Sequence, residues 1–173
     1  MPNYIRPDVT GATVFFTVCL ADRTSDLLVR RVDVLREAVR VTRQEKPFDI
    51  LAWVTLPDHL HCIWRLPADD KDFPRRWRSI KSKFSRNLPA RPKTRSQAKR
   101  GERGVWQRRF WEHHIRNEED LSTHIRYCWI NPMKHRLVQH PADWPYSSFH
   151  RDYQSGQVDS EWMTLPIEGD FGE

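Results

Sequence analysis

Two histidines two residues apart, His59 and His61, are the residues of this chain best placed to act together in chemistry. They lie in the run HLHCIWRL (59–66), which follows a Pro-Asp turn and is typical of a returning hairpin strand. Side chains alternate along a strand, so both imidazoles face one way while Leu60 and Cys62 face the other. Such a pair could hold one divalent cation with room left for an oxygen ligand and a phosphate. Two surface or hydrogen-bonded histidines are the alternative interpretation.

The elements that would position this pair follow the order β-α-β-β-α-β. We expect strands over 13–20, 49–56 and 59–66, a fourth within 107–116, and helices over 31–45 and from 73 to about 86. This order predicts an α+β, ferredoxin-like fold: a four-stranded antiparallel sheet with helices on one face. A C-terminal helix follows from Asn117 and is expected to end near Asn131, because Pro132 disfavours helical geometry at the residue before it. We expect an irregular loop over 87–104.

Length and composition indicate one globular domain, 1–150, followed by an acidic tail, 151–173. No stretch approaches the roughly 18 apolar residues of a membrane-spanning helix, so no membrane partner is expected. The first residues lack the apolar core of a signal peptide, which favours a cytoplasmic location. The three cysteines fall in expected core elements and are predicted to be reduced and buried.

The net charge of +6 is distributed unevenly. From residue 75 to 111 the chain has fourteen Lys or Arg against one acid, which predicts a surface for phosphates. The tail reverses the sign, and we expect it to lie over this basic surface and weaken nucleic-acid binding. The candidate DNA-binding residues of the basic segment are Arg75, Arg76, Arg78, Lys81, Lys83, Arg108 and Arg109.

Four sequence blocks together resemble a known family. They are LPDHLH (56–61), WQRRFWEHHIRNEEDL (106–121), YCWINPMKHRLV (127–138) and DWPYSSFHR (143–151). Over about residues 4–153 they are similar to the REP-associated tyrosine transposases, bacterial relatives of the single-tyrosine HUH transposases. The resemblance implies that His59 and His61 hold Mg²⁺ or Mn²⁺, that Asn131 supplies a third ligand and that Tyr127 on the C-terminal helix is the catalytic nucleophile. It also implies a contact of Tyr4 and Arg6 with DNA.

The resemblance further implies a metal-dependent single-stranded DNA endonuclease and strand transferase that acts on REP-type hairpins through a 5′-phosphotyrosine intermediate. Two other functions stay open on the sequence alone. One is a hairpin-binding protein of the same fold that does not cleave, and the other is a phosphohydrolase that uses activated water. The sequence leaves open whether the protein is a monomer or a homodimer.

Overall fold

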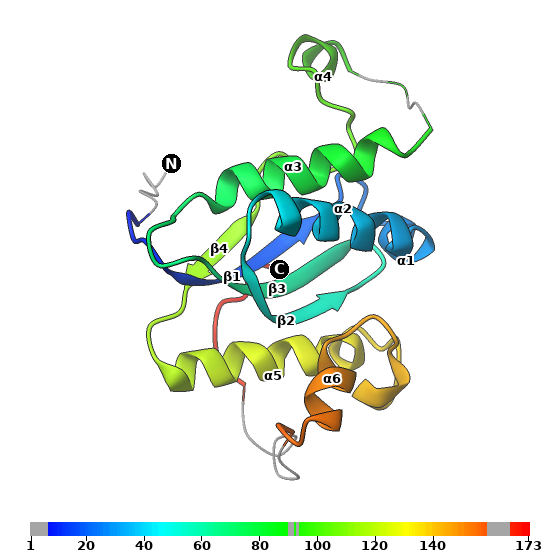
Figure 1. The fold of residues 1–173 in the computed structure, drawn as a ribbon. Coiled ribbons are helices and arrows are strands. Elements are labelled where there is room, and N and C mark those ends of the chain that lie inside the picture. Colours follow the sequence, from blue (N-terminus) through cyan, green and yellow to red (C-terminus); the bar gives the residue numbers. More distant parts are fainter. Residues whose placement is uncertain (1–6, 90–91, 93, 159–166) are drawn as a thin grey trace.

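The computed structural model describes residues 7–89, 92, 94–158 and 167–173 (Figure 1). In chain order the elements are β1 (Thr13–Cys19), α1 (Leu27–Arg30), α2 (Val32–Glu45), β2 (Asp49–Thr55), β3 (His59–Arg65), α3 (Phe73–Arg86), α4 (Arg95–Lys99), β4 (Trp111–His114), α5 (Glu118–Lys134), the 3₁₀ helix η1 (Pro141–Asp143) and α6 (Phe149–Gln154).

The four strands form one antiparallel sheet in the order β2-β3-β1-β4. This order confirms the expected α+β, ferredoxin-like arrangement. In the register of β1 and β3, Thr17 lies opposite His61 and Cys19 lies opposite His59. The two central strands therefore carry the histidine pair, with β4 and β2 on either side.

Helices lie on both faces of the sheet, α2 and α3 on one and α5 on the other (Figure 1), and each face carries its own hydrophobic layer. On one face, α2 and α3 cover the alternate β1 and β3 residues that include Phe16, Cys62 and Trp64, and Trp64 stacks on Trp77 of α3 with ring centroids 4.4 Å apart. On the other face α5 packs against the sheet, and Phe15 is among the residues of this layer. Because the strand period is two, the face that carries Phe15 also carries His59 and His61.

Helix α5 begins as expected and ends later than expected. The Asn117 side chain accepts a hydrogen bond from the Asp120 amide, as an N-cap residue does. The helix then passes through Pro132 to Lys134, so the prediction that it stops near Asn131 is wrong. Proline removes one helical hydrogen bond, and the last turn is completed by other amides. Arg136, at φ 57°, ends it in a Schellman motif in which the Leu137 amide donates to Pro132 O at 2.9 Å.

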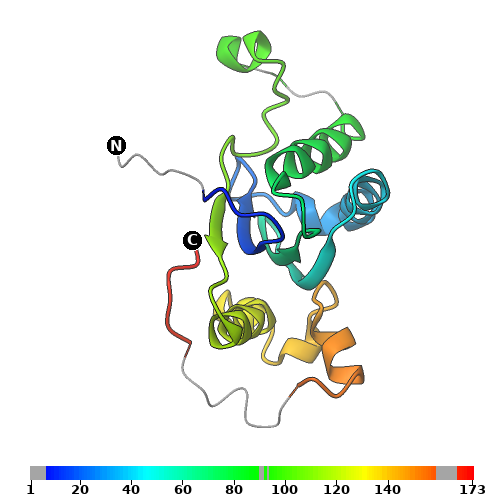
Figure 2. The same cartoon turned by 60° about the vertical axis from the view of Figure 1, so that its left-hand side comes forward.

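Two other segments differ from expectation. The loop expected over 87–104 contains α4, which Thr94 begins with a capping box. The tail contains the end of α6, and its last described stretch, 167–173, returns to the α5 side of the sheet, where Figure 2 shows it beside β4. Phe171 is buried there. Within the described ranges, no helix is long and apolar enough to cross a membrane.

Candidate active site

The histidine pair lies on the buried face of β3 under α5. His59 and His61 are 1% and 0% exposed, with ring centroids 5.0 Å apart. Each Nδ1 atom has a protein partner: Asp58 Oδ1 lies 2.7 Å from that of His59, and Thr17 Oγ1 lies 2.8 Å from that of His61. These contacts fix both rings so that the Nε2 atoms are directed into the same space between sheet and helix, the arrangement that second-layer hydrogen bonds give to metal-binding histidines.

Helix α5 brings Tyr127 and Asn131 to this space. The Tyr127 ring lies 5.2 Å from the His61 ring between centroids, and Asn131, one turn further on, is completely buried. The structure therefore brings together the four residues expected to form the active site. Tyr127 is itself 2% exposed, because the Phe171 ring stacks on it at 3.7 Å. Burial and the nearby Glu173 carboxylate raise the pKa of the Tyr127 phenol well above its usual value.

Three further residues lie in the candidate site, and none of them was predicted from the sequence. Lys134 donates a hydrogen bond from Nζ to Tyr127 Oη at 2.9 Å. The His135 ring lies 4.9 Å from the His59 ring. Both were missed because the helix was expected to end before them. The third is Glu173, which is 112 residues from His61 along the chain and has no local pattern that could indicate the contact.

The Glu173 carboxylate lies between the candidate metal ligands. Its Oε1 atom is 2.9 Å from His61 Nε2 and 3.5 Å from His59 Nε2, and it accepts from Asn131 Nδ2 at 2.9 Å. Its Oε2 atom pairs with Lys134. Burial alone would raise the pKa of this carboxyl, but the nearby His59 imidazole and the hydrogen bonds with His61, Asn131 and Lys134 hold that pKa far below its usual value. Glu173 is thus ionised, and an anion from the tail lies in the candidate active site.

This placement of Glu173 corrects the expected position of the tail. Basic helix α3 lies on the opposite face of the sheet from α5 (Figure 1). The described end of the tail packs on the α5 face, against Tyr127 and Phe15, and does not cover α3. Apolar packing of Phe171 together with the charged contacts of Glu173 explains why charge alone predicted the wrong surface.

The donor atoms fit a divalent cation. His59 Nε2 and Asn131 Oδ1 are buried and have no hydrogen-bond partner in the described part of the chain, an arrangement that usually has an explanation such as an ion. His59, His61 and Glu173 can also offer ligand atoms that lie within 4.8 Å of one another. Two imidazoles with amide or carboxylate oxygens are a suitable set for Mg²⁺ or Mn²⁺, with the histidines favouring the transition metal.

A second polar cluster stabilises the start of α5. Asp120 Oδ2 accepts from His113 Nε2 at 2.9 Å and from the Arg116 amide at 3.0 Å, and the His113 and His124 rings stack at 4.6 Å. Partial burial opposes ionisation of Asp120, but the hydrogen bonds from Arg116 and His113 lower the pKa of its carboxyl overall. Because Asp120 is already saturated by these donors, we assign the cluster a structural role.

The candidate DNA-binding residues of α3 differ in their availability. Arg75 and Arg78 are exposed. Arg76 is 1% exposed, and its guanidinium bonds Asp70 at 2.7 Å and the carbonyls of Lys46 and Pro47, so the prediction that it binds DNA is wrong. A cation with all its donors satisfied inside the protein has none left for phosphate.

The remaining candidates lie at the end of α3, before β4 or near the N-terminus. Lys83 pairs with Glu45. Lys81 donates to Gln107 O at 2.9 Å, and burial lowers its pKa to about 8, which leaves it mostly charged at neutral pH. Arg108 and Arg109 are exposed just before β4, whereas Tyr4 and Arg6 lie outside the described residues.

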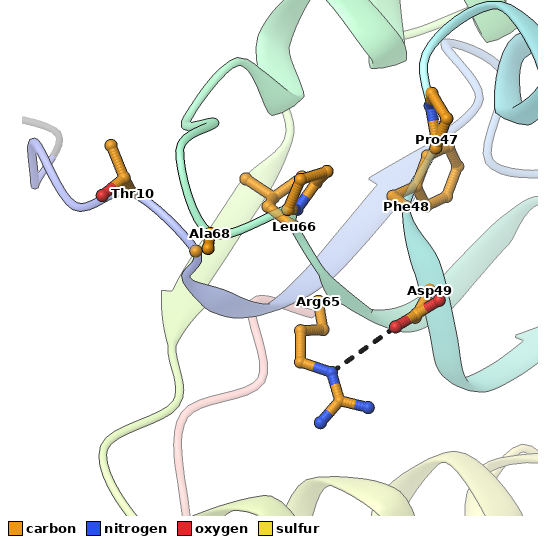
Figure 3. A pocket seen from close by; sticks show the side chains of 9 residues that line it. Thr10, Pro47, Phe48, Asp49, Arg65, Leu66 and Ala68 are labelled. Carbon is orange, nitrogen blue, oxygen red and sulfur yellow. Dashed lines mark ion pairs between the residues drawn. The ribbon is translucent and has the colours of Figure 1, made fainter.

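A cavity of about 500 Å³ lies at the other end of β3 from the histidine pair (Figure 3). Phe48, Leu66 and the Arg65–Asp49 ion pair, with 3.6 Å between Nε and Oδ2, line it. Arg65 lies six positions beyond His59 along β3, a span of about 20 Å at the usual strand rise. The cavity is therefore separate from the candidate active site.

Comparison with known proteins identifies the family. Residues 9–128 match the family model described as "Transposase IS200 like". The chain is 44% identical over 173 residues to the REP-associated tyrosine transposase of Escherichia coli strain K12, covering all of this chain and 98% of that one. A solved structure of a REP-associated tyrosine transposase bound to a REP hairpin is 42% identical, covers 100% of this chain and 94% of that chain, and superposes with a TM-score of 0.78. The chain therefore belongs to the IS200-like transposase family, as one of the REP-associated tyrosine transposases.

Proposed function

We propose that this transposase is a metal-dependent single-stranded DNA endonuclease and strand transferase that acts on REP-type hairpins. The observation that carries the proposal is that the Tyr127 phenol and the histidine pair lie together in one enclosed space, 5.2 Å apart between the Tyr127 and His61 rings. A protein that only binds hairpins needs neither group, and an enzyme that activates water needs no phenol.

The residues have separate tasks in this reaction. The Tyr127 phenol loses its proton to solvent, and Oη attacks the scissile phosphorus. The bond between Oη and phosphorus forms, and the bond from phosphorus to the 3′ oxygen breaks. The departing oxygen takes up a proton and becomes a free 3′-hydroxyl, while the 5′ phosphate stays on Tyr127. A later 3′-hydroxyl reverses these steps, because phenolate leaves more readily than an alkyl oxygen and the phosphodiester is conserved.

His59 and His61, with Asn131, would hold the cation. When bound, Mg²⁺ or Mn²⁺ would polarise the scissile phosphate and stabilise charge on it as a Lewis acid. Asp58 and Thr17 orient the two imidazoles through their Nδ1 atoms, so that both Nε2 atoms stay directed at the place where the cation would bind. Because Tyr127 and the histidines of one chain already meet, we propose that the tyrosine acts on the site of its own chain.

The test is a denaturing gel with a labelled REP-type hairpin, flanked by single-stranded DNA, and Mn²⁺ or Mg²⁺. We expect a covalent protein–DNA adduct that is absent in Tyr127→Phe and in His59→Ala. His140→Ala, an exposed histidine outside the site, is the matched control and should keep the adduct. Hairpin cleavage that persists in Tyr127→Phe would indicate water as the nucleophile and overturn the proposal, and so would hairpin binding without any cleavage.

A further inference from the structure

We propose that Lys134 is a catalytic residue, which holds the Tyr127 oxygen by a hydrogen bond and balances its negative charge during attack and during departure. This inference rests on the proposed function. It starts from geometry: Lys134 Nζ lies 2.9 Å from Tyr127 Oη and 4.9 Å from the centre of the Tyr127 ring. The cation therefore contacts the reacting atom itself.

The course of α5 explains how the two residues meet. Tyr127 and Lys134 are seven positions apart, which is close to two helical turns, so their side chains lie on one face of the helix. The contact exists only because α5 continues through Pro132 and ends in the Schellman motif at Arg136. A helix that ended at Asn131 would leave the lysine outside the active site.

The chemistry needs a cation at this position in both directions of the reaction. When Oη attacks phosphorus, the phenol has given up its proton to solvent, and the negative charge on Oη passes into the new bond. When a 3′-hydroxyl displaces the tyrosine, the Oη–phosphorus bond breaks and the charge returns to Oη. Lys134 keeps its proton throughout and donates a hydrogen bond to Oη, so that charge is stabilised by a fixed donor.

Glu173 limits the effect of Lys134 on Tyr127 while the tail is bound in the site. The Oε2 atom of Glu173 pairs with Lys134, so the carboxylate neutralises the ammonium that would otherwise act on Tyr127 alone. Departure of Glu173 would leave the lysine with the phenol as its partner. Lys134 should therefore be tested in a Glu173→Ala background, where loss of the lysine does not also loosen the tail.

The experiment compares adduct formation, at saturating hairpin DNA and Mn²⁺, in Glu173→Ala and in the same variant with Lys134→Met or Lys134→Arg. We expect Lys134→Met to lower the rate by about 10²-fold, the size of effect seen when an oxyanion loses one donor, because the attacking phenolate would lose the cation that favours its formation, and Lys134→Arg to restore most of it. Lys71→Met, which removes an exposed lysine paired with Asp8, is the matched control and should leave the rate unchanged. An unchanged rate in Lys134→Met, or weaker hairpin binding as its only defect, would overturn the proposal.

A second substrate locates the atom on which Lys134 acts. In DNA with sulfur in place of the scissile 3′ oxygen, the leaving group is a thiolate, which departs without a proton donor or a stabilising cation. The Lys134→Met defect should persist on this substrate if the lysine acts on Tyr127, whereas disappearance of the defect would place the lysine at the leaving group and refute the assignment. An adduct in Tyr127→Phe would instead refute the proposed function, so the two failures are distinguishable.

Discussion

Replacement of Glu173 by alanine should open the active site to the cation and to DNA. The carboxylate contacts His61 and Asn131 at 2.9 Å each, and its side chain is 17% exposed. A hydrogen bond to a charged group contributes about 1.5–3 kcal/mol, and ordering of the tail opposes part of this gain. We therefore assign roughly 2–3 kcal/mol to docking of Glu173, which corresponds to about a 30- to 150-fold preference for the closed site.

The assay is Mn²⁺ titration by calorimetry, followed by the rate of adduct formation at limiting metal. The Glu173 carboxylate competes with Mn²⁺ for the same site, so Mn²⁺ can bind only the fraction of molecules in which the site is open. Glu173→Ala should therefore bind Mn²⁺ more tightly, by up to about 30- to 150-fold. Glu168→Ala removes an equal charge from an exposed tail position and should change nothing. Weaker Mn²⁺ binding in Glu173→Ala would refute this reasoning, because it would mean that Glu173 is a metal ligand.

Three further predictions concern stability. Arg76→Ala should lower the free energy of unfolding by about 3 kcal/mol, because it removes a buried cation and leaves Asp70 without its partner. Arg78→Ala should change the free energy of unfolding by less than about 0.5 kcal/mol and should weaken hairpin binding. Equal stability of the two variants would contradict the buried role of Arg76. Arg136→Gly should raise the free energy of unfolding by about 1 kcal/mol, because glycine adopts φ 57° without strain. If urea unfolding showed Arg136→Gly to be no more stable than Arg136→Ala, the backbone at this position would not be strained. Burial lowers the pKa of His61 to about 4 in the metal-free folded protein. As pH falls below 6.5, the unfolded chain therefore binds a proton on His61 at a higher pH than the folded protein does. Unfolding free energy should thus fall by about 3 kcal/mol between pH 6.5 and 4, and an identical pH slope in His61→Asn would argue against this origin.

Sequence periodicity predicted the elements that position the site, and the family resemblance predicted which residues of the C-terminal helix belong to it. The two-residue spacing of His59 and His61 placed both on one face of a strand, whereas the roles of Tyr127 and Asn131 followed from the resemblance. The order of the elements then indicated the ferredoxin-like sheet, because few topologies accommodate that order. These features depend on local repeats, which a single sequence contains.

The remaining features depend on contacts that no local pattern encodes. Lys134 and His135 were missed because Pro132 was expected to end the helix, although completion of the last turn by other hydrogen bonds offsets the loss of one amide donor. Arg76 was grouped with its exposed neighbours because its burial depends on Asp70, which precedes the helix and has no helical spacing to it. Glu173 reaches the histidines across the fold, and opposite charge indicated the wrong surface for the tail.

Peptide mapping of the protein–DNA adduct by mass spectrometry tests the central claim most directly. The protein would be incubated with hairpin DNA and Mn²⁺, digested with protease and nuclease, and searched for a peptide that carries a nucleotide through its 5′ phosphate. The account predicts the modification on Tyr127, with a free 3′-hydroxyl on the other DNA fragment. A nucleotide on Tyr146 or Tyr153, or DNA cleaved without any modified peptide, would contradict it.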